Sequence, residues 1–199
     1  MTTQRIFDWE NTYKSNKVTD LPWYNPNLEI DLQHALEKLD LKSGTFLDLG
    51  TGPATQAQKL KEWGFEVTGT DISSEAVTQA KQAYPDLELV QDDILQTHLT
   101  KTFDFILDRG CFHVIDPGDR AIYVKNVVKL LNDSGILFLK CFSDKMPDTG
   151  SGPYRISRQI IEETFEPWFS VEEIKDTEFS TGPDRGPVKS LFVILKRAK

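Results

Sequence analysis

A chain of 199 residues with 39% hydrophobic residues is long enough for one globular domain with a sizeable core. Its 31 acidic and 23 basic residues give a formal net charge of −8, which disfavours nucleic acid as a partner. No apolar run approaches the ~20 residues that cross a membrane, and the first residues lack the apolar segment of a secretory signal. With only Cys111 and Cys141 as thiols, we expect a reduced, cytoplasmic setting without a membrane partner.

Predicted strands and helices alternate along most of the chain. An aromatic N-terminal stretch comes first, and apolar spacing then predicts helices over 28–41, 54–63, 119–131 and 158–165 and one that begins at Ser73 or Ser74. Apolar runs predict strands over 45–49, 65–70, 87–90, 103–107, 135–142, 169–174 and 190–195. Such alternation is typical of a doubly wound α/β sheet. Residues 181–187 suit a hairpin, so we expect seven strands, mostly parallel, with one antiparallel strand near the C-terminus.

The first predicted strand ends in an acid that two glycines follow. Asp48 precedes Gly50 and Gly52, and the second strand closes with Asp71. A dinucleotide fingerprint requires a small residue at the third glycine position, where this chain has Thr55. A carboxylate at position 48 would repel a pyrophosphate but suits a cationic ammonium and sulfonium. The pattern therefore predicts S-adenosylmethionine (SAM) as the ligand.

The run Asp-x-Gly-x-Gly-x-Ala over 48–54 resembles the class I SAM-dependent methyltransferases. Asp71, the Gln-Asp-Asp-Ile segment at 91–94 and the strand over 103–108 extend the resemblance over about 45–142. Trp9, Tyr13 and Trp23 near the N-terminus, and the Asp-Arg-Gly run at 108–110, resemble the thiopurine and small-thiol methyltransferase branch. The resemblance implies a Rossmann-like single domain, 1–199. In it, 1–43 form a lid and helix, 44–142 the cofactor-binding half and 143–199 the substrate-side part.

The same resemblance implies a set of cofactor contacts at the carboxyl ends of the strands. The expected cofactor-binding residues are Trp9, Tyr13, Trp23, Asp48, Gly50, Gly52, Asp71, Ile72, Asp93, Ile94 and Asp108. Asp71 would accept two ribose hydroxyls, or alternatively help to cap the following helix. Asp93 would accept the adenine amine while the Ile94 amide meets a ring nitrogen, and Asp92 competes for this role. The aromatic residues would close a lid over the sulfonium, or simply pack on the sheet edge.

The loop after the fourth strand is where the transferred methyl group should lie. Asp108 and His113 are the catalytic candidates: Asp108 would orient the donor or the substrate, and His113 is either a general base or a packing residue. Arg109 would bind an anionic group of the substrate or pair with a neighbouring acid. Tyr154 and Arg155 are expected to line the acceptor pocket, and no metal is expected.

These residues predict a SAM-dependent methyltransferase that acts on a small molecule. A thiol or another chalcogen is favoured as acceptor, because a free thiol with a pKa of about 8.5 is already partly ionised at neutral pH. One alternative is a methyltransferase for a protein or nucleic-acid side chain. Another is a non-catalytic SAM-binding regulatory domain, and an NAD enzyme is more distant. The sequence specifies neither the acceptor nor the oligomeric state.

Overall fold

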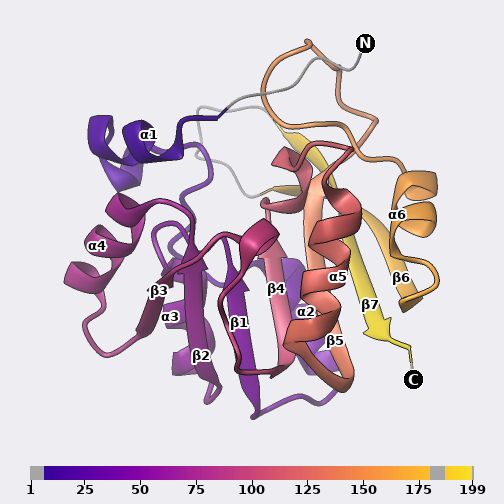
Figure 1. Cartoon of the computed structure of the whole chain (residues 1–199), viewed down its shortest axis with the longest axis horizontal. Helices are drawn as coiled ribbons and strands as arrows, with labels where there is room; N and C mark the ends of the chain where they lie inside the picture. Colours follow the sequence, from indigo (N-terminus) through magenta and orange to yellow (C-terminus); the bar gives the residue numbers. More distant parts are fainter. Residues whose placement is uncertain (1–6, 180–186, 199) are drawn as a thin grey trace.

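The computed structural model describes residues 7–179 and 187–198, and within them seven strands form one sheet in the order β3-β2-β1-β4-β5-β7-β6 (Figure 1). The strands are β1 (Thr45–Leu49), β2 (Glu66–Asp71), β3 (Glu88–Gln91), β4 (Phe103–Arg109), β5 (Leu131–Phe142), β6 (Phe169–Phe179) and β7 (Val188–Arg197). Only β7 runs against the others in this described sheet, because it pairs antiparallel with both β5 and β6. The predicted mostly parallel sheet with one antiparallel strand is confirmed. Residues 180–186 of the predicted hairpin lie outside the described residues.

Six α-helices and three short 3-10 turns connect the strands over the described residues. They are α1 (Trp9–Ser15), α2 (Ile30–Lys38), α3 (Thr55–Glu62), α4 (Ser74–Ala83), α5 (Arg120–Leu130), α6 (Arg158–Phe165), η1 (Val18–Asp20), η2 (Ile94–Gln96) and η3 (Phe112–Val114). Ser73 caps α4, since its hydroxyl accepts a hydrogen bond from the Ala76 amide at 3.1 Å. Helix α1 was not predicted from the sequence. Its one buried residue, Tyr13, gives no periodic apolar face to detect.

Helices cover both faces of the sheet because strand side chains alternate between them. In β4, Phe105 and Leu107 face a core formed with α2, α3 and α4, whereas Ile106 faces a second core with α5 and α6. In Figure 1, α5 lies in front of the sheet and α2 behind it. The doubly wound, Rossmann-like α/β architecture is therefore confirmed. Among the described residues, no helix has the length and apolarity needed to cross a membrane.

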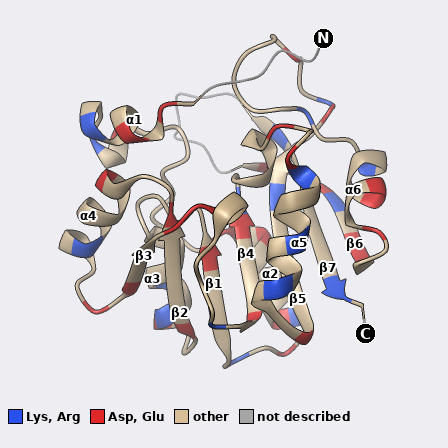
Figure 2. Ribbon diagram, in the orientation of Figure 1, with Lys and Arg blue, Asp and Glu red and all other residues tan. Residues whose placement is uncertain are grey.

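The strand order places the carboxyl ends of β1 and β4 side by side at the point where the chain changes direction across the sheet. In open α/β sheets, ligands bind at this switch point. The N-terminal segment with α1 and the long connection between β5 and α6 both lie over this edge, at the top of Figure 1. The ends of β1, β2 and β4 are marked by acidic residues (Figure 2). The fold thus brings together the acids that the sequence analysis singled out.

Candidate active site

Asp48 lies on β1 and is almost completely buried, with 3% of its surface exposed. Its Oδ2 accepts a hydrogen bond from the Thr51 hydroxyl at 2.6 Å. Burial raises the pKa of Asp48 to about 6, although this hydrogen bond and the charge of Arg109 act in the opposite direction. A cation bound beside this carboxylate would favour its ionised form. The environment therefore fits the expected ammonium or sulfonium of SAM.

The loop after β1, which contains Gly50 and Gly52, is called the glycine loop below. Asp71 ends β2 and joins this loop to the start of α4. Its Oδ2 accepts a hydrogen bond from the Gly52 amide and its Oδ1 one from the Ser73 amide, both at 2.9 Å. Burial raises the pKa of this carboxyl group. A carboxylate has about four acceptor positions, so two protein donors leave room for ribose hydroxyls. Capping of α4 belongs to Ser73, which Asp71 holds in place.

The two motif glycines adopt conformations that side chains rarely take. Gly50 has φ +67° and Gly52 has φ +49°. A Cβ atom on Gly52 would lie 2.5 Å from the Tyr13 hydroxyl, and one on Gly50 would lie 3.2 Å from the Cys111 Cβ. The loop backbone is therefore approached closely from the N-terminal segment on one side and from the loop after β4 on the other.

The N-terminal aromatic residues pack together above this loop. Trp9 and Tyr13 each make an edge contact with Trp23, at centroid distances of 5.6 and 6.2 Å, and the Trp23 indole N–H donates to the Tyr13 hydroxyl at 3.1 Å. Tyr13 is buried, with 4% exposed. Ile72, the residue after β2, is by contrast 51% exposed. The rings of Tyr13 and Trp23 thus pack over Gly52, an arrangement that is compatible with either expected role of the aromatic residues.

Glu10 fastens α1 to the N-terminus of α4. Its carboxylate accepts hydrogen bonds from the hydroxyls of Ser73 and Ser74, at 2.8 and 2.9 Å, and from the Glu75 amide at 3.2 Å. These donors, Ser73 foremost, lower the pKa of Glu10 to about 2. Negative charge at a helix N-terminus is also favoured by the helix dipole. Helix α1 is therefore anchored to the element that follows Asp71.

The two candidates for adenine recognition point to different partners. The Asp93 carboxylate accepts from the Leu95 amide at 2.9 Å and caps η2, whereas the Asp92 carboxylate accepts from the His98 amide at 2.9 Å. Asp93 lies close enough to Cys111, in the loop after β4, for its charge to help raise the pKa of that thiol, which burial raises most. Ile94 is buried in the first position of η2. Asp93 remains the expected adenine-binding residue, with Asp92 as its competitor.

Replacement of Asp93 by Ala should therefore weaken binding of S-adenosylhomocysteine (SAH), whereas replacement of Asp92 by Ala should leave it nearly unchanged. Loss of one hydrogen bond to a charged group corresponds to about 1.5–3 kcal/mol, or about tenfold to a hundredfold in affinity. Calorimetric titration of both variants measures this. Because each carboxylate also holds a backbone amide, the thermal midpoint of both variants serves as the control. The opposite ordering would mean that the assignment is shifted by one residue.

Asp108 is fully buried at the end of β4, and its carboxylate is occupied by the protein itself. Oδ1 accepts from the amides of Gly110 and Cys111, and Oδ2 accepts from the Phe112 amide and, at 2.6 Å, from the Tyr123 hydroxyl. Burial raises its pKa to about 6 against these hydrogen bonds. Four donors fill the acceptor capacity of a carboxylate. These hydrogen bonds favour a role for Asp108 in shaping the loop after β4 over direct contact with the reacting atoms.

His113 is also placed for packing and not for proton transfer. Its Nδ1 accepts a hydrogen bond from the Phe142 amide at 3.0 Å, and its ring makes an edge contact with Phe142 at 4.6 Å. Burial, reinforced by the charges of Arg155 and Arg109, lowers the pKa of His113 to about 3. The neutral ring carries its proton on Nε2 when Nδ1 accepts. Of the two roles that the sequence left open for His113, general base and packing residue, this geometry favours packing.

Replacement of His113 by Asn tests whether His113 is a packing residue or a general base. The Asn carbonyl can still accept from the Phe142 amide, so the folded protein should retain most of its methyl transfer rate, within a few-fold. Removal of a true general base would lower the rate by about 10²–10⁴-fold. Single-turnover measurements with saturating SAM distinguish these results, and circular dichroism verifies that the variant is folded. A hundredfold loss in a folded variant would restore the catalytic role.

Arg109 both pairs with an acid and keeps one free nitrogen. Its Nε donates to Glu29 at 2.7 Å, its Nη1 donates to the Trp23 carbonyl at 3.0 Å, and the guanidinium lies 5.2 Å from the centre of the Phe179 ring. The side chain is 7% exposed. Its Nη2 is buried and has no hydrogen-bond partner among the residues that the structure describes. The geometry is therefore compatible with both roles that the sequence suggested for Arg109, namely pairing with an acid and binding an anionic group of the substrate.

Behind Arg109 lies a chain of buried charges that the sequence analysis missed. Lys140 Nζ donates to Glu29 at 2.5 Å and to Asp31 at 2.7 Å, and Lys175 donates to Asp31 at 2.9 Å. Lys140 and Glu29 are fully buried. We refer to Arg109, Glu29, Lys140, Asp31 and Lys175 as the ion chain. The only signal in the sequence was Lys140 as the single charged residue within an apolar strand.

Tyr154 lies against the loop after β4, and Arg155 lies over a ring at the end of β5. The Tyr154 amide donates to the His113 carbonyl at 2.7 Å, and its hydroxyl donates to Asp116 at 3.1 Å. The Arg155 guanidinium lies 5.2 Å from the centre of the Phe142 ring. The long connection after β5 is therefore tied to the candidate site. In the described part of the chain, no three His, Cys, Asp or Glu side chains are grouped to hold a metal ion.

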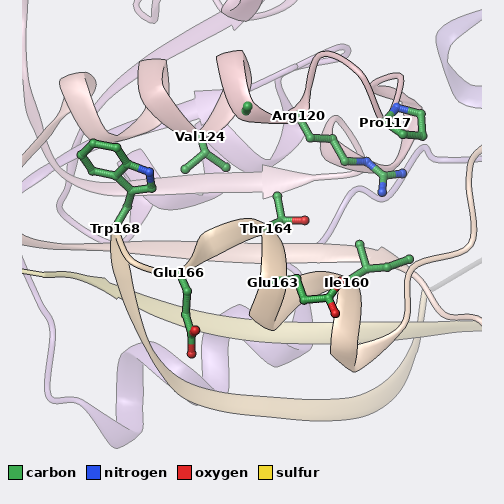
Figure 3. A pocket seen from close by; sticks show the side chains of 9 residues that line it. Pro117, Arg120, Val124, Ile160, Glu163, Thr164, Glu166 and Trp168 are labelled. Atoms are coloured by element: carbon green, nitrogen blue, oxygen red, sulfur yellow. The ribbon is translucent and has the colours of Figure 1, made fainter.

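An open groove of about 440 Å³ lies elsewhere, between α5 and α6 (Figure 3). It is lined by Pro117, Arg120, Ala121, Val124, Ile160, Glu163, Thr164, Glu166 and Trp168. None of these residues belongs to the expected cofactor or acceptor site. At the strand edge itself, the Tyr13 hydroxyl is packed directly over Gly52. The groove is therefore separate from the cofactor site that the sequence predicts.

Comparison with known proteins supports the reading of the strand edge. Residues 46–135 match the family described as methyltransferase domain. An uncharacterized methyltransferase of Schizosaccharomyces pombe is 30% identical over 103 residues, which cover 49% of this chain and 71% of that protein. An uncharacterized methyltransferase of Alkaliphilus oremlandii is 29% identical over 66% of this chain, although the match spans only 63% of that protein.

Longer matches show where the likeness extends. A probable thiol methyltransferase of Arabidopsis thaliana is 26% identical over 189 residues, which cover 91% of this chain and 81% of that protein. Among solved structures, a SAM-dependent methyltransferase from Anabaena variabilis superposes with a TM-score of 0.74 at 18% identity, covering 96% of this chain and 93% of that one. At this identity the structural likeness concerns the fold.

Proposed function

Because the chain belongs to the SAM-dependent methyltransferases, we propose that it transfers the methyl group of SAM to a small nucleophile, namely a thiol or another chalcogen compound. The observation that carries this proposal is that, among the described residues, neither of the two candidate bases in the loop after β4 has a free acceptor position for the proton of an acceptor. His113 is neutral with its Nδ1 occupied, and the Asp108 carboxylate is saturated by four donors. A thiol needs little assistance, since part of it is ionised at neutral pH. The similarity to a probable thiol methyltransferase points in the same direction.

The proposed mechanism assigns positioning to the protein and the reactive group to the cofactor. SAM supplies an activated methyl group when bound. Gly50 and Gly52 would let the backbone approach it, and Asp71 and Asp93 would hold its ribose and adenine. The thiolate of the acceptor would take up the methyl group, which would leave a thioether and SAH as products, and the thiol proton would go to solvent. In-line alignment can supply much of the lowering of the barrier.

We assign the three parts of the chain accordingly, within one domain. Residues 1–43 would cover the cofactor, 44–142 would bind it, and 143–199 would border the acceptor. The described contacts support this division, because Trp23 and Tyr13 lie over the glycine loop and Tyr154 lies against the loop after β4. A lid that excludes water strengthens the electrostatic interactions within the site.

The test is a product assay with methyl-labelled SAM and cell extract, fractionated into small molecules and macromolecules, followed by a panel of thiols, selenols, phenols and amines. We expect label in the small-molecule fraction and turnover of thiols or selenols. If acceptor ionisation limits the reaction, the rate should rise with pH toward the pKa of the acceptor itself. Label confined to protein or nucleic acid would overturn the proposal, and absence of any product would favour a non-catalytic SAM-binding domain.

A further inference from the structure

The ion chain crosses the acceptor side of the sheet from β4 to β6. Arg109 lies at the end of β4, Lys140 in β5 and Lys175 in β6, while Glu29 and Asp31 come from the start of α2. Only Lys175 is substantially exposed, at 46%. Burial of such charges is costly, and well-packed apolar residues often give equal or greater stability. Stability alone is therefore a weak reason for five linked charges at this position.

The ion chain fixes the orientation of one group, the Arg109 guanidinium. Glu29 accepts from Arg109 Nε with one carboxylate oxygen and from Lys140 Nζ with the other, at 2.7 and 2.5 Å. Lys140 is held in turn by Asp31 and by the Glu178 carbonyl at 2.8 Å. Because both oxygens of Glu29 are engaged, the carboxylate cannot rotate without breaking an ion pair. The plane of the guanidinium is set by this arrangement.

One guanidinium nitrogen remains for a ligand. Arg109 Nη2 is enclosed and lacks a partner among the described residues, and a buried N–H group is costly when left unpaired. The guanidinium that carries it donates through Nη1 to the Trp23 carbonyl, faces the Phe179 ring, and lies close enough to Asp48 for its charge to lower the pKa of that carboxyl group. This is the edge of the sheet where the proposed function places the acceptor.

We propose that Glu29 and Lys140 are positioning residues that direct Arg109 Nη2 toward an anionic group of the acceptor, either a carboxylate or the thiolate itself. The inference rests on the proposed function for the identity of the acceptor. A guanidinium offers fixed N–H directions that an ammonium does not. Loss of the Glu29 charge should therefore weaken binding of the anion while the cofactor site on β1 and β2 remains intact.

The experiment compares wild type with Glu29→Gln and Arg109→Lys on three thiols: thiophenol, 2-mercaptobenzoate and the methyl ester of 2-mercaptobenzoate. If Nη2 receives the carboxylate, both variants should raise the KM for 2-mercaptobenzoate about tenfold, with little change in kcat, in the KM for the ester or in the KM for SAM. If Nη2 receives the thiolate, the KM should rise for all three thiols, and the pH midpoint of kcat/KM should move upward. Either pattern supports the proposal and identifies the group.

The exposed Lys38, 67% exposed and paired with Glu173 outside the ion chain, supplies the control. Lys38→Met should leave every KM unchanged. If Glu29→Gln does not fold, Asp31→Asn is used instead, because it weakens the other ion pair of Lys140. It should give the same pattern of KM changes with smaller increases. A fall in thermal midpoint without any selective change in KM would overturn the proposal, and Nη2 would then be bonded to water.

A binding assay separates this inference from the proposed function. In the presence of SAH, thiophenolate and 2-(methylsulfanyl)benzoate form complexes that cannot react, and their affinities are measured by calorimetry. Glu29→Gln should weaken the binding of at least one of the two anions about tenfold, whether or not wild type methylates small thiols. Turnover of thiols with no change in anion affinity would retain the proposed function and reject the role of Glu29.

Discussion

Replacement of Lys140 by Met is expected to lower the free energy of unfolding by about 3–5 kcal/mol, the range for removal of one partner from a buried ion pair. Lys140 Nζ is fully buried and donates to Glu29, Asp31 and the Glu178 carbonyl at 2.5–2.8 Å. Met preserves most of the apolar stem, so the loss arises mainly from two carboxylates left without their shared cation. Urea denaturation followed by circular dichroism measures it.

Lys175→Met is the matched control for this change, because Lys175 is paired with the same Asp31 but is 46% exposed. Exposed ion pairs contribute about 0–1 kcal/mol, so the control should unfold almost like wild type. A loss below about 1 kcal/mol for Lys140→Met would mean that Glu29 and Asp31 accommodate the missing charge, by taking up protons or by turning to water. The ion chain would then not be held together by Lys140.

The elements that were predictable from the sequence are those whose signals are local. Strand β1 coincides with the predicted 45–49, and Ser73 caps α4 as one of the two expected residues. Strand β5 begins at Leu131, four residues before the predicted start. Polar residues follow Leu131, and at this point the pairing of β5 with β4 is irregular. A strand interrupted in this way lacks the continuous apolar run that marked it in the sequence.

The parts of the site that escaped prediction depend on contacts between distant residues. Lys140 is 111 residues from Glu29 and 109 from Asp31 in the chain, so no spacing rule connects them. The roles of Asp108 and His113 were obscured for a similar reason. Whether an acid at a strand end faces a ligand or its own loop depends on how that loop folds. Here the Tyr123 hydroxyl from α5 donates the fourth hydrogen bond to the Asp108 carboxylate.

Asp71 and Asp108 illustrate this difference at the ends of β2 and β4, the two strands that flank β1. Both are buried carboxylates that accept backbone amides, and the sequence assigned both to the cofactor. Asp71 accepts two amides, whereas Asp108 accepts three amides and a hydroxyl. We expect the remaining acceptor capacity, which no sequence pattern reports, to separate a ligand-binding carboxylate from one that shapes a loop.

Replacement of Asp71 by Ala is expected to weaken binding of SAM and SAH by about tenfold to a hundredfold, the equivalent of about 1.5–3 kcal/mol for hydrogen bonds to a charged group. The loss has two sources. The carboxylate would no longer accept the ribose hydroxyls, and the Gly52 and Ser73 amides would lose the acceptor that holds the glycine loop against α4. Titration calorimetry at neutral pH measures the affinity.

Asp71→Asn separates these two contributions. The Asn carbonyl oxygen can accept from one of the two amides, Gly52 or Ser73, but the side chain loses its charge and one acceptor oxygen. If ribose recognition dominates, Asn should weaken SAH binding nearly as much as Ala. If loop geometry dominates, Asn should retain a large part of the affinity, and the thermal midpoint should fall more for Ala than for Asn. Unchanged affinity in both variants would remove Asp71 from the cofactor site and would require the ribose to be bound elsewhere along the carboxyl edge of the sheet.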